Sequence, residues 1–128
     1  DNKASEIKIV LSSQAIELIL KELFENSKKF HPEESPQIHI ELTLFANRLR
    51  LRFSDNGVSL SPQQLAQMWL PYYQGEKYFT GEVAGVGLGL AMVASLVWEV
   101  GGQCRGYNRT QGHGIVIELM IPLPQYEF

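Results

Sequence analysis

Residues 21–30 read KELFENSKKF and lie within a long amphipathic pattern. Apolar side chains recur there every three or four residues, which is the period of one face of an α-helix. This stripe consists of Ile16, Ile19, Leu20, Leu23, Phe24, Ser27 and Phe30. Because Ser12 and Ser13 are good N-cap residues, we expect a helix from there to about Phe30, with the stripe facing a core.

A flank of this helix carries the side chains best suited to chemistry, Glu22, Asn26 and Lys29. The neutral carbonyl oxygen of Asn26 suits Mg²⁺ when phosphates already supply the negative charge. Glu22, one turn earlier, is placed to take a proton from an attacking hydroxyl or to polarise a metal-bound water. Lys29 is placed to meet phosphate oxygens. The alternative for all three is an ordinary solvated helix surface.

The remaining chain alternates between strand and helix patterns. Residues 38–44 and 48–53 alternate in polarity around Ala46-Asn47, which predicts a hairpin pairing Leu44 with Leu49, Leu42 with Leu51, Ile40 with Phe53 and Glu41 with Arg52. We also expect a short strand at 7–11, a helix after Ser61-Pro62, an apolar helix over 88–100, and strands at 103–108 and 114–121. Residues 70–86 show no periodicity and are interpreted as an active-site lid.

Two glycine-containing segments are candidate ligand contacts. Asp55 and Gly57 follow a strand, where the carboxylate could accept a hydrogen bond from an exocyclic amine such as that of adenine while Gly57 leaves room for a flat ring. Gly85, Gly87 and Gly89 precede the apolar helix, and a helix N-terminus attracts anions through its free N–H groups. The alternative for Asp55 is an ordinary Asx turn, and the alternative for the three glycines is close helix packing.

Composition narrows the class of protein. The chain has 128 residues, 45% hydrophobic and 20% charged, and a net charge of −3, which indicates one folded domain and argues against non-specific binding of nucleic acid. Cys104 is a single cysteine, which favours a reducing compartment, and the longest apolar run is too short to span a membrane. Since the chain does not begin with Met, we expect it to be part of a longer protein.

Five motifs occur in the order that is typical of one family. KELFENSKKF, DNGVS, WLPYYQ, GVGLGL and GHG resemble the N box, first glycine box, F box, second glycine box and third glycine box of the ATP-binding domain of sensor histidine kinases, in the GHKL superfamily. The resemblance covers nearly the whole chain. It implies an α+β fold of the Bergerat type: a two-layer sandwich in which a mixed sheet is covered on one face by three helices, with a flexible ATP lid.

The resemblance also implies residue roles. Asn26 would be the Mg²⁺ ligand and Lys29 a phosphate contact. Phe30 would lie near the adenine, and Asp55 and Gly57 would recognise it. Backbone amides of the second glycine box would hold the triphosphate. That box contributes Gly85, Gly87, Leu88 and Gly89. Tyr72 in the F box is counted among the cofactor-binding residues, and Glu22, Asn26 and Lys29 form the expected catalytic set.

Some positions depart from the family pattern. Ser59 stands where a second glycine is usual, and Ile115 where threonine is usual. Glu22 matches the general-base glutamate of the superfamily's ATPases, DNA gyrase and MutL, whereas many kinases have asparagine there. Two alternatives to a kinase therefore stay open: a GHKL-type ATPase or molecular switch that uses Glu22, and a non-catalytic nucleotide-binding regulatory module.

The kinase interpretation predicts partners that this sequence lacks. None of His31, His39 and His113 lies in a phosphoacceptor box, so the acceptor histidine is expected on a separate dimerisation domain of the same kinase. A response regulator would receive the phosphoryl group afterwards. We expect the cofactors ATP and Mg²⁺, a cytoplasmic location, a monomeric isolated domain, and no contact of this domain with nucleic acid or membrane.

Overall fold

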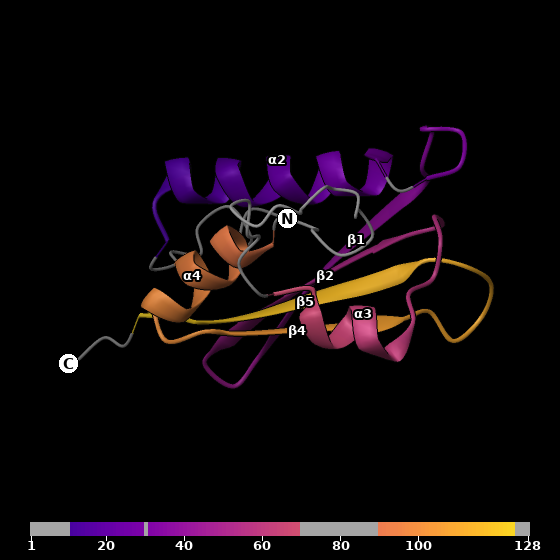
Figure 1. Ribbon diagram of the computed structural model, residues 1–128. Helices are drawn as coiled ribbons and strands as arrows, with labels where there is room; N and C mark the ends of the chain where they lie inside the picture. The colour runs from indigo at the N-terminus through magenta and orange to yellow at the C-terminus, as the bar shows by residue number, and fades with distance from the viewer. Residues whose placement is uncertain (1–10, 30, 70–89, 125–128) are drawn as a thin grey trace.

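The computed structural model describes residues 11–29, 31–69 and 90–124 (Figure 1). The elements in these ranges are α2 (Ser13–Lys29), β1 (Ile38–Phe45), β2 (Arg48–Asp55), α3 (Pro62–Gln67), α4 (Ala91–Glu99), β4 (Gln103–Asn108) and β5 (Ile115–Pro122). They reproduce the predicted order of helices and strands. Within the described ranges, no helix is both long and apolar enough to cross a membrane.

The sheet has the strand order β1-β2-β5-β4, and each neighbouring pair in it is antiparallel. The mixed sheet that the resemblance implies is therefore not seen in the described part of the chain, and residues 7–10 of the expected first strand lie outside it. The hairpin is confirmed in register: Ile40 pairs with Phe53, Leu42 with Leu51 and Leu44 with Leu49. Alternating polarity fixes this register because a slip of one residue would turn every side chain to the other face.

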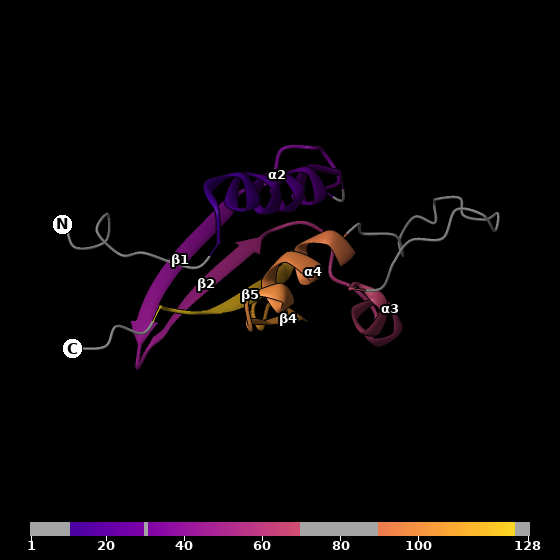
Figure 2. The same cartoon turned by 90° about the vertical axis from the view of Figure 1, so that its left-hand side faces the viewer.

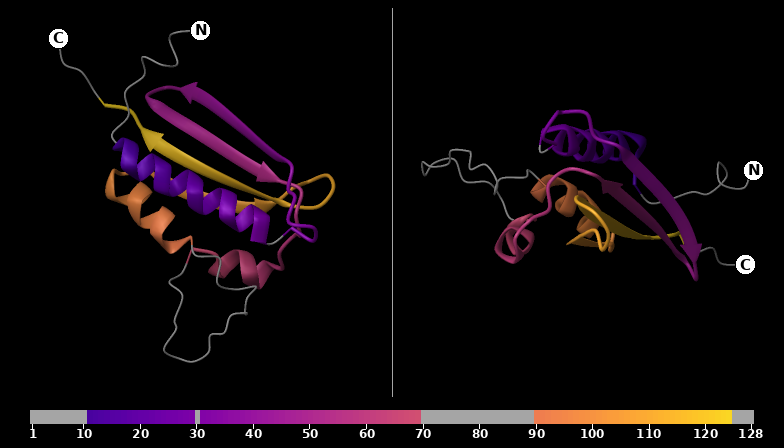
Figure 3. Two further views of the ribbon diagram at one scale, coloured as in Figure 1. Left: turned by 90° about the horizontal axis from the view of Figure 1, so that it is seen from above. Right: turned by 90° about the vertical axis from the view of Figure 1, so that its right-hand side faces the viewer.

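The helices lie on one side of the sheet, so the molecule has two layers (Figure 2). Helices α2 and α4 run side by side over the sheet (Figure 3). The chain leading out of α3 packs on β4, where the Met68 side chain lies against Gly106. Side chains on the covered face form the core. Its largest fully buried members are Phe53, Leu23, Met68, Leu90, Leu119, Val93 and Val97. The two-layer α+β architecture expected from the sequence is confirmed.

Local signals in the sequence explain where the helices begin. The Ser12 side-chain oxygen accepts a hydrogen bond from the Ala15 N–H at 3.1 Å, as expected of an N-cap. Ser61 and Gln64 form a reciprocal capping box around Pro62 at the start of α3. Helix α4 begins at Ala91, later than the expected residue 88, and its capping residue Leu90 is fully buried.

Candidate functional site

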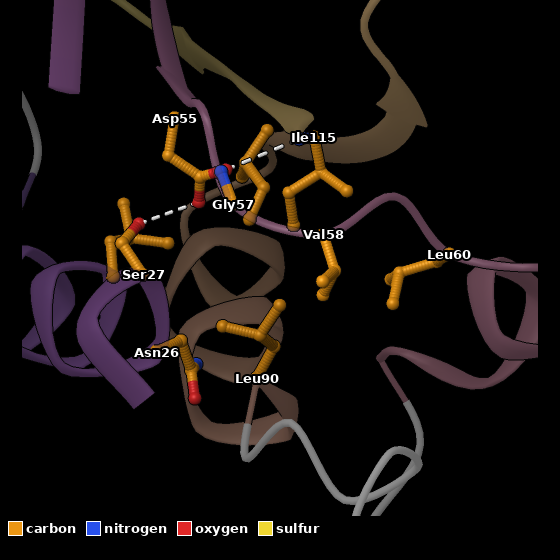
Figure 4. Close-up of a pocket in the computed structure, with 10 residues that line it drawn as sticks. Asn26, Ser27, Asp55, Gly57, Val58, Leu60, Leu90 and Ile115 are labelled. Carbon is orange, nitrogen blue, oxygen red and sulfur yellow. Dashed lines mark hydrogen bonds between the residues drawn. The ribbon is translucent and has the colours of Figure 1, made fainter. Parts of the chain in front are cut away.

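A hollow lies where the second half of α2 meets the end of β2, the start of α4 and the start of β5. Among its lining residues are Asn26 and Ser27 from α2, Asp55 and Gly57 at the end of β2, Leu90 and Ile115 (Figure 4). Three of the predicted site residues, Asn26, Asp55 and Gly57, are thereby brought together. The hollow has an empty volume of about 380 Å³, part of it open to solvent.

The Asp55 carboxylate is the most strongly held group in the hollow. It is 6% exposed, and its Oδ1 accepts hydrogen bonds from the N–H groups of Gly57 at 3.0 Å and Ile115 at 3.3 Å. Its Oδ2 accepts a hydrogen bond from the Ser27 hydroxyl at 2.8 Å. Buried polar groups need such partners. These bonds fix the plane of the carboxylate, with both oxygens acting as acceptors.

The third glycine motif supports Asp55 from the other side. Gly114 has φ +123°, and a Cβ on it would lie 1.9 Å from the carbonyl oxygen of Asp55. Its N–H donates a hydrogen bond to the Ser59 side-chain oxygen at 3.2 Å. Only glycine permits both the positive φ and the close approach of the two backbones. The turn before β5 is thus locked against the end of β2.

Both departures from the family pattern form part of this arrangement. Ser59, in place of a glycine, is the acceptor for Gly114. Ile115, in place of a threonine, contributes its backbone N–H to Asp55, which does not depend on the side chain. The Asn108 side-chain amide adds a further support, since it donates to the Leu60 carbonyl oxygen at 2.8 Å and accepts from the Leu60 N–H at 2.9 Å.

The predicted flank of α2 reaches the same hollow through Asn26. The amide nitrogen of Asn26 is buried and has no hydrogen-bond partner among the described residues. Glu22 is half-buried one turn earlier, and Lys29 is exposed in the last turn of the helix. Burial, together with the negative charge of Glu25, raises the pKa of the Glu22 carboxyl against the opposing charges of Lys29 and Lys21.

The remaining predicted site residues lie outside the described ranges. These are Phe30, Tyr72, Gly85, Gly87, Leu88 and Gly89, together with the expected lid over residues 70–86. The described Leu90, directly after the glycine motif, lines the hollow. Leu90 therefore lies in the same wall region as Asn26 and Asp55.

Sequence reasoning missed the part played by Ser27. It placed this residue in the apolar stripe of α2, and Ser27 is indeed buried, with 3% of its surface exposed. A hydroxyl in an otherwise apolar helix stripe needs a partner, which is a signal that could have pointed to Asp55. The contacts made by Asn108 and by the Ile115 backbone had no comparable signal, because they depend on how distant strands pair.

Other reactive side chains do not form a second site in the described ranges. Burial raises the pKa of the Cys104 thiol to about 12, so it stays protonated at neutral pH. The Nδ1 atom of His31 accepts hydrogen bonds from the N–H groups of Glu33 and Ser35, which fixes the loop after α2. The residues that the structure describes contain no group of three or more His, Cys, Asp or Glu side chains placed to hold a metal ion.

The chain matches the family described as "Histidine kinase-, DNA gyrase B-, and HSP90-like ATPase" over residues 12–125. It belongs to this family. The class that fold and family define is an ATP-binding domain of the type shared by histidine kinases, DNA gyrase B and HSP90.

The curated relatives include sensor kinases. The chain is 30% identical over 125 residues to the autoinducer 2 sensor kinase/phosphatase LuxQ of Vibrio harveyi, covering 94% of this chain and 14% of that protein. It is 27% identical over 90 residues to the sensor protein kinase WalK of Staphylococcus haemolyticus, covering 70% of this chain and 15% of that protein. The chain thus spans only a small part of the length of these relatives.

Solved structures share the fold. The mycobacterial sensor histidine kinase MprB superposes with a TM-score of 0.70 at 20% identity, covering 92% of this chain and 78% of that one. Full-length ShkA in complex with AMPPNP gives a TM-score of 0.70 at 22% identity, covering 95% of this chain and 24% of that one. These solved structures confirm the predicted fold, and the match to the family model confirms the predicted family.

Proposed function

We propose that this chain binds Mg·ATP and presents the γ-phosphoryl group to a histidine on a separate helical domain of a two-component sensor kinase. The observation that carries the proposal is the hollow in which Asn26 and the triply hydrogen-bonded Asp55 lie together. A buried carboxylate with a remaining acceptor position suits the exocyclic amine of adenine. Apolar walls such as Leu90 and Ile115 suit the faces of the ring.

Asn26 is the residue proposed to hold Mg²⁺. The residues present fit that ion, because an amide carbonyl is a hard, neutral ligand and no described hydrogen bond holds the Asn26 amide nitrogen in its present orientation. A bound Mg²⁺ would neutralise charge on the phosphates. The exposed Lys29, further along the same helix, is proposed to contact phosphate oxygens from its flank.

The remaining proposed contacts come from segments outside the described ranges. We assign the triphosphate to the amides of Gly85, Gly87, Leu88 and Gly89, and ring contacts to Phe30 and Tyr72. Phosphoryl transfer then depends on positioning the nucleotide and on stabilising charge, with little covalent chemistry for the protein itself. The attacking imidazole belongs to the partner domain.

The proposed setting follows from this role. The chain is taken as one ATP-binding domain, residues 1–128, with the lid at about 70–86, and the phosphoacceptor domain and response regulator are its partners. We place the domain in the cytoplasm, where ATP is made and a single thiol stays reduced. In isolation it is expected to be a monomer.

The proposal is tested by Asn26→Asp, which alters the ligand proposed for Mg²⁺. Binding of Mg·ATP is measured by calorimetry, and phosphoryl transfer is followed with labelled ATP and the acceptor domain of the same kinase. We expect the variant to lose at least about tenfold in transfer, because the added charge disturbs both ion and phosphates. Asn47→Asp, an exposed turn residue on the hairpin, is the matched control. Unchanged affinity and transfer in Asn26→Asp would contradict the proposal.

A second candidate function is ATP hydrolysis with Glu22 as general base. The observation in its favour is the raised pKa of the Glu22 carboxyl, caused chiefly by burial. This function predicts steady hydrolysis by the isolated chain that Glu22→Ala abolishes. The kinase proposal predicts little hydrolysis from either protein, so a phosphate-release assay separates the two.

A third candidate is a regulatory module without catalysis, which the departures from the family pattern at Ser59 and Ile115 would favour. Both positions retain hydrogen bonds that support Asp55, which argues for intact nucleotide binding. Binding of ATP without any transfer to the acceptor domain would favour this candidate.

A further inference from the structure

Ser27 shares the hollow with Asp55 and contacts it directly. It lies on the buried face of α2, and its hydroxyl donates a 2.8 Å hydrogen bond to Asp55 Oδ2 (Figure 4). We propose that Ser27 is a positioning residue that sets the preference of this site for an amine-bearing purine over one that lacks the amine. This inference rests on the proposed function, in which the base lies beside Asp55.

The hydrogen bonds of Asp55 leave a defined position open. A carboxylate offers about four lone-pair sites, two on each oxygen. The N–H groups of Gly57 and Ile115 both approach Oδ1, which fills that oxygen. Ser27 takes one site on Oδ2. The second lone-pair site on Oδ2 receives no hydrogen bond from the described residues. Because Asp55 lines the hollow, this site is available to a ligand there.

Ser27 also determines which ligand groups can bind at this wall of the hollow. Its hydroxyl has one proton, and that proton is committed to Asp55 Oδ2. Toward a ligand, therefore, both Ser27 Oγ and Asp55 Oδ2 present lone pairs alone. A ligand that brings an N–H is held at this wall, whereas a carbonyl oxygen would meet two acceptors and be repelled.

Loss of the hydroxyl would release one side of the carboxylate. The two bonds to Oδ1 would remain, but Oδ2 would have no donor from α2, and the carboxylate could turn about its bond to Cβ. A buried acceptor without its partner is costly, and a misaligned one makes a poorer hydrogen bond. The effect should appear for ligands that carry the amine and be absent for ligands that do not.

The experiment compares two nucleotides in Ser27→Ala by calorimetry. One is ATP, and the other is purine riboside triphosphate, in which hydrogen replaces the exocyclic amine. We expect the ratio of the two affinities to fall by about tenfold in the variant, through weaker ATP binding, because one well-placed hydrogen bond is worth about that factor. Ser54→Ala is the matched control, since Ser54 lies beside Asp55 in sequence but its hydroxyl faces the His39 carbonyl oxygen.

Alanine is a better helix former than serine, so the variant should fold, and circular dichroism checks this. Should it unfold, Ser27→Cys supplies the same comparison with a weak S–H donor, and an intermediate ratio is expected. An unchanged ratio in a folded variant, or an equal loss for both nucleotides, would overturn the inference while leaving the proposed function intact. Equal affinity of the native chain for the two nucleotides would overturn the adenine-reading role of Asp55 itself.

Discussion

Gly114 shows how closely a single position can constrain the site. Its backbone lies against the carbonyl of Asp55. Asp55, the proposed base contact, therefore cannot move independently of the turn before β5. The neighbouring Gly112 also has a positive φ, of +81°, but a Cβ there would meet only the Arg109 guanidinium, at 4.0 Å. Alanine substitutions at the two glycines therefore separate the free-energy cost of backbone strain from that of a steric clash.

Gly114→Ala is expected to destabilise the fold by at least about 3 kcal/mol, because a clash with Asp55 adds to the strain of a positive φ. Gly112→Ala should cost only about 1 kcal/mol, the strain alone. Urea unfolding followed by circular dichroism measures both. Equal costs for the two variants would mean that the close approach to Asp55 is not maintained in solution.

For single residues, the sequence predicted that Asn26, Asp55 and Gly57 belong to the site, but not which hydrogen bonds hold them there. The residue types suited the chemistry, and the hollow brings them together. The donors to Asp55 could not be predicted, because Ser27 comes from α2 and the Ile115 N–H from β5, and only the packed fold places these elements beside the end of β2.

Helix α2 joins the core to the site. Ile19 and Leu23 anchor it on the sheet, at 3% and 1% exposure, while Leu18 on its outer side is 45% exposed. Asn26 and Ser27 follow one turn after these anchors. The position of the site residues therefore depends on the apolar stripe that precedes them in the same helix.

Leu23→Ala is expected to cost about 2–5 kcal/mol, since it leaves a cavity in the core. Leu18→Ala should change stability by no more than about 0.5 kcal/mol, because that side chain is largely exposed. Thermal or urea unfolding measures the two. A small effect of Leu23→Ala would indicate that α2 does not pack on the sheet as described.

The outer face of the sheet carries an ionic network around Glu118. This carboxylate is 5% exposed; Tyr107 donates a hydrogen bond to it, and the guanidinium groups of Arg52 and Arg105 lie 3.3 and 3.6 Å from its oxygens. Burial alone would raise the pKa of Glu118, but the bond from Tyr107 and the two positive charges outweigh it and lower the pKa. The network joins β2, β4 and β5.

Because the pKa of Glu118 is lowered on folding, its contribution to stability is present above the ordinary value of 4.5 and is lost as the pH falls through the lowered value. Glu118→Gln should therefore reduce stability at neutral pH and weaken the acid dependence below about pH 4.5. Glu41→Gln is the control, since Glu41 is half exposed and such pairs contribute little. The measurement is the urea midpoint of each variant across this pH range. The same pH dependence in both variants would contradict the account.

Element by element, prediction was most accurate where polarity alternates strictly. The β1–β2 hairpin has the register that its alternation and the Ala46-Asn47 turn indicate. Prediction was less accurate for the start of α4, placed at residue 88 but found at Ala91. An apolar run does not mark its own first turn when glycines precede it and no polar N-cap is present.

Across the whole molecule, the two faces of the sheet differ in kind. One face holds the helices, the core and the hollow beside Asp55, and the other holds the charged network around Glu118. The order of elements could be predicted from the polarity patterns, and the family from five motifs that occur in the order typical of it. The antiparallel pairing throughout the described sheet could not be predicted, because strand patterns alone do not fix which strands become neighbours.

The central claim is that nucleotide enters the hollow between α2 and the end of β2. Backbone N–H signals in NMR spectra report this directly when Mg·ADP is titrated into the isotopically labelled chain. The account predicts shifts at Gly57 and Ile115, whose N–H groups hold the Asp55 carboxylate, and none at Arg52 and Tyr107 on the outer face. Shifts confined to the outer face, with Gly57 and Ile115 unchanged at saturation, would contradict it.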